Sequence, residues 1–344
     1  MVLRYVLVMA LAAAPAFAQT NEPAVGAAPV LEDRYPERRT AFPGGVVGLA
    51  DLTYSSLAGY RPLTLDLYRP ADTSKPHGLV LYVHGGGWQS GHTRHSAAFE
   101  NWPGVLAPIA ARGYVVASLE YRLSSEAPFP AAIQDVKAAI RWLRTHASEY
   151  GIDRQRAVIW GGSAGGQLAA LAGTSCGVAA LEPPGAAANQ RPEPGARASG
   201  TNGSASGPAA TESDCVQGVI AWYGIFDFAT LASDLPAAPR RYLGCEHAEC
   251  TEAAAAASAT TYIDAKDAPV LMIHGVNDKT VPIQQSRDYL AALRAKGVPA
   301  ELIEVPGVDH SFIGATNEAT RAASLQALRK SLEFIDRTLG PGRN

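Results

Sequence analysis

Short, continuous apolar runs are the feature that most constrains how this chain can fold. They occupy residues 79–83, 114–119, 157–160, 216–222 and 269–274. A strand has this composition when helices cover both faces of its sheet, because none of its side chains then faces water. The runs therefore predict a mostly parallel sheet at the centre of the fold.

Amphipathic helical segments alternate with these runs. Apolar residues recur every three or four positions over residues 133–143, and again over residues 325–335 near the end of the chain. An apolar stripe of this period packs one face of a helix against a sheet. Residues 63–67 alternate leucine with polar residues, as a half-buried strand does. We therefore expect one α/β domain over residues 46–340, with helices on both faces of its sheet.

The N-terminus has the pattern of a cleaved secretory signal. Arg4 gives a positive flank, residues 5–14 are apolar, and residues 16–18 (AFA) fit a small-x-small cleavage site. We expect residues 1–18 to be removed and residues 19–45 to form a linker. The mature protein would then be secreted or periplasmic. An uncleaved anchor or a buried N-terminal helix is the alternative.

Composition excludes two classes of function. The 344 residues include 29 Lys and Arg against 32 Asp and Glu, without a basic cluster, whereas a non-specific nucleic-acid binder needs a basic surface. Outside the N-terminus, no run of about 18 apolar residues is available to span a membrane. We expect neither a nucleic-acid partner nor a membrane span, and the sequence does not indicate an oligomeric state.

A serine stands where one predicted strand meets a helix. Residues 161–165 read Gly-Gly-Ser-Ala-Gly, between the strand at 157–160 and a helical segment at 167–172. A sharp strand-to-helix turn needs small residues around the serine, because Cβ atoms would clash in its strained backbone. The turn would present the Ser163 hydroxyl at a helix N-terminus, where N–H groups stabilise negative charge. Ser163 is the candidate nucleophile, and an ordinary glycine–serine loop is the alternative.

A serine nucleophile needs a base, and the base needs an acid that orients it. Asp278 and His310 follow later strand-like segments, in the chain order serine, aspartate, histidine. Loops after parallel strands meet at one edge of a sheet, so we expect both side chains beside Ser163. Asp227 also follows a strand and is the alternative acid. Asp309 is adjacent to His310, a spacing that is poorly suited to orienting the ring.

A glycine-rich segment after an early strand can supply donors to an oxyanion. Residues 84–88 read His-Gly-Gly-Gly-Trp, and the missing side chains let the amides of Gly86 and Gly87 approach a substrate oxygen. The amide of Ala164 would complete the oxyanion hole. We expect Trp88 to line the substrate pocket, with ordinary packing as the alternative.

No metal-ligand cluster such as H-E-x-x-H occurs in the sequence. His84 and His274 stand at the predicted edge of the sheet, and we expect both to be structural. The sequence therefore predicts a reaction without a metal or another cofactor.

Residues 177–214 depart from the strand–helix alternation. They are rich in Pro, Gly, Ala, Ser and Asn, so they cannot bury enough apolar surface to offset their chain entropy. We expect a mobile surface insertion there. Cys176 and Cys215 flank it, and we expect a disulfide between them to close its base, with Cys245 and Cys250 paired locally. Four unpaired thiols are the alternative.

Five motifs occur together between residues 51 and 339: HGGGW (84–88), EYRL (120–123), GGSAGG (161–166), HGVNDKTVP (274–282) and DHSF (309–312). In combination they resemble the α/β-hydrolase esterases, particularly the hormone-sensitive-lipase-like and bacterial feruloyl-esterase-like branch. The resemblance implies an α/β-hydrolase fold, with Ser163 as nucleophile, Asp278 as acid and His310 as base. The insertion departs from the usual pattern of this family.

The function implied is that of a serine carboxylic-ester hydrolase that forms an acyl-enzyme. Its substrate would be a small-molecule or carbohydrate-linked ester of a small or aromatic acid, of the acetyl or feruloyl type. Two alternatives remain open. A prolyl-oligopeptidase-like serine peptidase shares the catalytic core but usually carries a large extra domain, and a non-catalytic binding protein could use the same fold.

Overall fold

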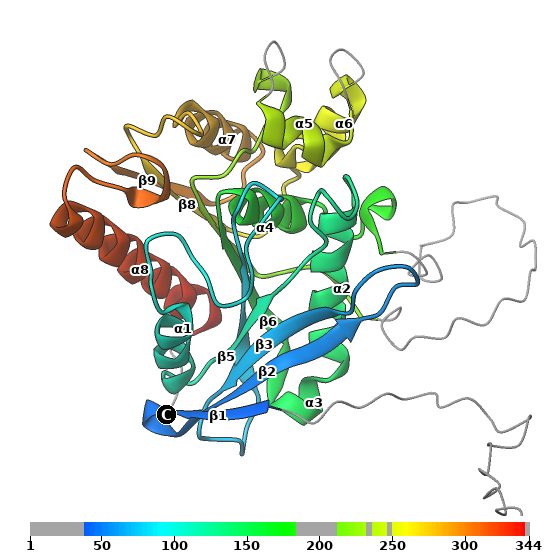
Figure 1. Ribbon diagram of the computed structural model, residues 1–344, viewed down its shortest axis with the longest axis vertical. Helices are drawn as coiled ribbons and strands as arrows, with labels where there is room; N and C mark the ends of the chain where they lie inside the picture. Colours follow the sequence, from blue (N-terminus) through cyan, green and yellow to red (C-terminus); the bar gives the residue numbers. More distant parts are fainter. Residues whose placement is uncertain (1–37, 184–211, 232–235, 246–249, 341–344) are drawn as a thin grey trace, which may run out of the picture. The chain divides into compact units, whose positions relative to one another are not determined.

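A nine-stranded sheet forms the centre of the computed structural model, which describes residues 38–183, 212–231, 236–245 and 250–340 (Figure 1). In spatial order the strands are β1 (Arg38–Phe42), β2 (Val46–Ser55), β3 (Leu63–Arg69), β5 (Val115–Leu119), β4 (His77–Val83), β6 (Ile152–Gly162), β7 (Gly218–Trp222), β8 (Val270–Gly275) and β9 (Ala300–Val305). The pairings from β1 to β5 are antiparallel. Those from β5 to β9 are parallel. The expected mostly parallel α/β sheet is confirmed.

Helices cover both faces of this sheet. They are α1 (Trp102–Ala111), α2 (Ala131–Thr145), α3 (Ala147–Tyr150), α4 (Ala164–Thr174), α5 (Ala237–Leu243), α6 (Cys250–Ala257), α7 (Gln284–Ala295) and α8 (Asn317–Leu339). One apolar core joins the sheet to α2, α4 and α7, and a second core on the opposite face joins it to α1 and α8 (Figure 1). None of the described helices has both the length and the apolar character needed to cross a membrane.

The periodic segments of the sequence form the helices that were expected from them. In α2 the apolar stripe faces the sheet, and Ile133, Val136 and Leu143 are fully buried. Strand β4 is buried over its whole length, as its continuous apolar run predicted. Burial on both faces therefore explains the composition of the central strands.

The boundary expected for the N-terminal linker differs from the structure. The signal segment 1–18 and residues 19–37 of the linker lie outside the described residues. Residues 38–42, which were also assigned to the linker, form β1 and pair antiparallel with β2. Phe42 fixes this edge strand by packing edge-on against Tyr68, with ring centroids 5.5 Å apart.

At its two ends, the segment 177–214 also differs from the expectation of a mobile insertion. Its middle, 184–211, lies outside the described residues. Leu181 and Asp214 are both buried. The ammonium of Lys137 in α2 is fully buried and donates to the Asp214 carboxylate over 2.7 Å. Arg141, one turn further along α2, pairs with both Glu182 and Asp214. These ion pairs fix both ends of the segment, although its local composition favours disorder.

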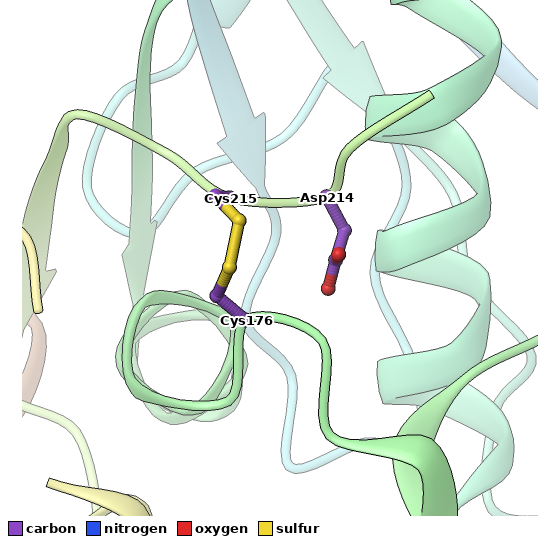
Figure 2. A group of neighbouring side chains, drawn as sticks. All are labelled: Cys176, Asp214 and Cys215. Atoms are coloured by element: carbon purple, nitrogen blue, oxygen red, sulfur yellow. A yellow bond between two sulfur atoms is a disulfide. The ribbon is translucent and has the colours of Figure 1, made fainter. Parts of the chain in front are cut away.

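Two disulfides join the four cysteines, Cys176 with Cys215 and Cys245 with Cys250. The first connects the segment after α4 to the segment that enters β7, and the carboxylate of Asp214 lies beside it (Figure 2). This is the pairing that the positions of the cysteines in the sequence predicted.

Candidate active site

Ser163 lies on the turn between β6 and α4, with φ 56° and ψ −122°. A non-glycine residue with positive φ is uncommon and costs free energy, so the surrounding packing must maintain it. The Ser163 amide donates to the carbonyl oxygen of Trp222 in β7 over 2.9 Å. At position 165 a Cβ atom would overlap the carbonyl oxygen of Val83, which explains why glycine stands there. The turn is thus held by the strands on both sides of β6.

His310 joins the serine to the expected acid. Its Nε2 lies 2.9 Å from the Oγ of Ser163, and its Nδ1 lies 2.8 Å from Oδ2 of Asp278. An ionised carboxylate can only accept hydrogen bonds, so Nδ1 donates to Asp278. In the neutral ring Nε2 is then free to accept the proton of the serine hydroxyl. The three side chains come from the loops after β6, β8 and β9, as their order in the sequence predicted.

Asp278 is surrounded by donors. Its Oδ1 accepts from the amides of Thr280 and Val281 at 2.9 and 2.8 Å, and its Oδ2 lies 3.2 Å from Nε2 of His274. Burial acts to raise the pKa of Asp278, but hydrogen bonds from His274 and His310 outweigh it and hold that pKa well below its usual range. The carboxylate therefore stays ionised and can stabilise a positive charge on His310.

His274 has a closer relation to the site than the sequence indicated. It is fully buried in β8, and its Nδ1 lies 2.7 Å from the hydroxyl of Ser286 in α7. Its Nε2 also faces the carbonyl oxygen of Val281 at 2.9 Å. The four-residue spacing between His274 and Asp278 was visible in the sequence, but the hydrogen bonds of the ring to α7 and to the acid were not.

The two rival acids have other partners. The carboxylate of Asp227 accepts from the amide of Ala229, and within the described ranges no hydrogen bond joins it to His310. Asp309 accepts from the amides of Lys279 and His310, so it contacts the backbone of the histidine and not its ring. The hydrogen bond from His310 Nδ1 therefore favours Asp278 over Asp227 and Asp309 as the acid that orients the ring.

The glycine-rich segment after β4 faces the serine. Gly86 and Gly87 have φ values of 112° and 61°, and both line the cleft that contains Ser163. A Cβ atom at Gly86 would overlap the carbonyl oxygen of Ser90, so only glycine fits this turn. Within the described part of the chain, the amides of Gly86 and Gly87 donate to no protein acceptor. Ala164 is the first residue of α4, where amides have no partner in the helix.

The cleft over these residues has a volume of about 570 Å³. Its walls include imidazoles and hydroxyls that no local sequence pattern indicates. The ring of Tyr223 meets that of His310 edge-on, with centroids 4.9 Å apart. The lining residues are Tyr82, Gly85, Gly86, Gly87, Ser90, Gly91, His92, His95, Ser96, Ala97, Gly162, Ser163, Tyr223, Thr280, His310 and Ser311.

Trp88 does not line this cleft, in contrast to the expectation from the sequence. Its side chain is only 2% exposed and stacks on Tyr242, with ring centroids 4.3 Å apart. The indole N–H donates to Oε1 of Gln167 over 3.0 Å. Burying a large indole costs little free energy when its N–H keeps a hydrogen bond, and this explains the position of Trp88 in the core.

His84 has the structural role that was expected of it. It is buried, its ring stacks on Tyr121, and its Nδ1 lies 2.8 Å from the carbonyl oxygen of Gly85. Burial lowers the pKa of His84 to about 4, so its ring is neutral around pH 7.

A metal ion would need several free ligand groups close together. Among the described residues, one group of ligand types lies close together: Cys176, Asp214 and Cys215. The two sulfur atoms are bonded to each other (Figure 2). The carboxylate is paired with Lys137, so all three groups already have partners. This group therefore does not offer free ligands.

A mostly parallel sheet of this order, with a serine on the strained turn after β6 and a histidine–aspartate pair beside it, is the arrangement of the serine α/β-hydrolases, a class that includes esterases. The comparisons agree with this class. The chain belongs to the BD-FAE family, whose model matches residues 65–293.

Known proteins of similar sequence and structure carry esterase names. Esterase LipC of Mycobacterium tuberculosis is 31% identical over 72% of this chain and 56% of its own length. Thermogutta terrifontis esterase 2 with bound propionate is 28% identical, with a TM-score of 0.64 over 86% of this chain and 96% of that one. A truncated carbohydrate esterase from gut microbiota is 26% identical, with a TM-score of 0.65 over 85% and 95% of the two chains. This chain spans less than two thirds of the length of each of the first curated relatives that it matches.

Proposed function

We propose that this protein is a serine carboxylic-ester hydrolase that acts through an acyl-enzyme. One observation carries the proposal, a continuous chain of two hydrogen bonds. The first joins Ser163 Oγ to His310 Nε2 over 2.9 Å, and the second joins His310 Nδ1 to Asp278 Oδ2 over 2.8 Å. Such a chain activates a hydroxyl that is otherwise a weak nucleophile. The esterase names of the compared proteins support the same reaction class.

In the first half of the reaction, the Oγ of Ser163 attacks the ester carbonyl carbon while Nε2 of His310 takes the hydroxyl proton. The carbonyl oxygen becomes an oxyanion, which accepts hydrogen bonds from the amides of Gly86, Gly87 and Ala164. The C–O bond to the alcohol then breaks, and His310 returns its proton to the leaving alkoxide. The acyl group remains on the serine.

In the second half, His310 takes a proton from water as the water oxygen attacks the acyl carbon. The tetrahedral intermediate collapses, Ser163 regains its proton, and the acid leaves. Asp278 remains ionised throughout and stabilises the imidazolium form of His310.

We extend the proposal to esters of small or aromatic acids, of the acetyl or feruloyl type, linked to small molecules or to carbohydrates. Polar side chains in the cleft support a polar alcohol, since their imidazoles and hydroxyls can bond to its oxygens: Ser90, His92, His95, Ser96 and Thr280. The carbohydrate esterase among the compared structures supports the same extension. The two disulfides support a secreted or periplasmic location.

Kinetics of the wild-type protein and of Ser163→Ala on a panel of acetyl, butyryl and feruloyl esters, with peptide p-nitroanilides included, test the proposal. We expect ester turnover in the wild type and a loss of at least about 10⁴-fold in the variant. Near-wild-type ester turnover by folded Ser163→Ala would refute the serine mechanism. A preference for the anilides would identify a peptidase, and the absence of turnover on every substrate would indicate a binding protein.

A further inference from the structure

Trp88 connects the two segments that would supply the oxyanion amides. It directly follows Gly86 and Gly87, and its indole Nε1 donates to Oε1 of Gln167 over 3.0 Å. Gln167 lies in the first turn of α4, three residues after Ala164. Its backbone N–H donates to the carbonyl oxygen of Ser163 over 3.0 Å. One buried hydrogen bond thus joins the loop after β4 to the start of α4.

The surroundings fix both partners of this bond. Gln167 is fully buried and its Nε2 donates to the carbonyl oxygen of Ala257 over 2.9 Å, so its Oε1 is the end that faces Trp88. Stacking on Tyr242 holds the indole plane, and the carbonyl oxygen of Trp88 accepts from the amide of Ser124 over 2.7 Å. Neither partner can change its direction without breaking another contact.

The backbone of Trp88 gives a second, independent observation. Its φ is 57°, a left-handed conformation that is strained for a bulky residue and persists only where the surrounding contacts maintain it. This strained residue immediately follows Gly87, whose amide direction depends on the same turn. The contacts of the Trp88 side chain therefore hold the backbone immediately after Gly87.

We propose that the Trp88–Gln167 hydrogen bond sets the position of the Gly86 and Gly87 amides relative to the Ala164 amide. Trp88 and Gln167 are then positioning residues and do not touch the substrate. The inference rests on the proposed ester hydrolysis. Oxyanion donors act over about 2.7–3.1 Å, so a loop that shifts by a fraction of an ångström loses transition-state stabilisation without losing substrate binding.

The variant Trp88→Phe tests this directly, because it keeps an aromatic ring against Tyr242 and removes only the N–H donor and part of the ring area. We expect kcat to fall about 10-fold or more, with KM within about 3-fold of the wild-type value. The same factor should apply to acetyl and butyryl esters. The inhibition constant of a boronic acid that forms a tetrahedral adduct should rise by a similar factor, since the adduct uses the oxyanion donors.

Gln167→Met removes the same bond from the other side, together with the bond from Gln167 Nε2 to the carbonyl oxygen of Ala257, and keeps the test valid if Trp88→Phe does not fold. Each single variant should lower kcat, and the double variant should be no slower than the slower single one, because the Trp88–Gln167 bond is the interaction that both changes break. Tyr114→Phe is the matched control: it removes a hydroxyl that bonds to Asp336 and to the carbonyl oxygen of Gly340, just before β5 and therefore at the opposite ends of the strands from Ser163. It should lower the melting temperature while kcat stays unchanged.

Three results would overturn the inference. Folded Trp88→Phe with wild-type kcat would show that the bond does not position the amides. A raised KM at constant kcat in Trp88→Phe would show that Trp88 acts in substrate binding. Losses of kcat that add in the double variant would show that the two residues act separately. Each of these can occur while Ser163→Ala is inactive, so they are distinguishable from a failure of the proposed function.

Discussion

At the scale of single residues, the sequence predicts which candidate reacting groups lie together better than it predicts the residues that support them. Ser163, Asp278 and His310 stand in loops whose strand context was readable, and the structure brings the three side chains together. The burial of Trp88 was not readable, because it depends on Gln167 and Tyr242, which are far away in the sequence. Local patterns indicate where strands end, but not which distant side chains meet there.

The choice of acid gives the first residue-scale prediction. Asp278→Asn should lower kcat by about 10⁴-fold, because an amide in place of the carboxylate favours the wrong histidine tautomer and cannot stabilise the imidazolium. Asp227→Asn should change kcat by less than about 3-fold, since its carboxylate bonds to a turn amide. Steady-state kinetics on p-nitrophenyl acetate measure both, and a larger loss in Asp227→Asn would move the acid to that residue.

At the scale of elements, the strands buried on both faces were predicted and the edge strand was not. Strand β1 is mostly exposed and has no apolar run, so its composition resembles that of a linker, and its conformation comes from backbone pairing with β2. The ends of the 177–214 segment were missed for a similar reason. Their order depends on charges of α2 more than 30 residues earlier in the chain, such as Lys137.

The attachment of this segment to α2 gives the element-scale prediction. Burial acts to raise the pKa of Asp214, but its pairing with Lys137 outweighs this and holds the pKa below its usual range. Asp214→Asn leaves the buried ammonium without its closest carboxylate, so the free energy of unfolding should fall by about 3 kcal/mol at about pH 7. A depressed folded-state pKa stabilises the fold fully above the unfolded value of about 3.9. The difference between wild type and variant should therefore shrink as the pH falls below about 4.

Urea unfolding at several pH values measures this difference. Arg154→Ala is the control, because Arg154 pairs with Glu212 at the same end of the segment but is half exposed, and its loss should cost less than about 1 kcal/mol. An Asp214→Asn difference that grows in acid, or one no larger than that of the control, would contradict the account of the buried pair.

At the scale of the whole molecule, one continuous sheet with two cores positions the site. The two disulfides limit the conformational freedom of the unfolded chain. The Cys176–Cys215 bond spans 39 residues, whereas Cys245–Cys250 spans 5. In the chain-entropy model a longer closed loop removes more conformational freedom from the unfolded state. The two bonds should therefore contribute unequally to stability.

Serine replacement of each pair tests this inequality. Removing Cys176–Cys215 should lower the free energy of unfolding by about 4 kcal/mol, and removing Cys245–Cys250 by about 2 kcal/mol. Denaturant titrations of the two double-serine variants give these values. Equal losses, or a larger loss at the shorter loop, would show that the entropy of loop closure does not dominate.

The central claim is that Ser163 carries the acyl group during turnover. Rapid-quench mass spectrometry of the protein mixed with p-nitrophenyl acetate tests this claim most directly. We predict a transient acetyl adduct on the peptide that contains Ser163, formed fast enough to account for turnover and absent from Ser163→Ala. Steady ester turnover with no adduct at Ser163, or with the adduct on another residue, would contradict the account.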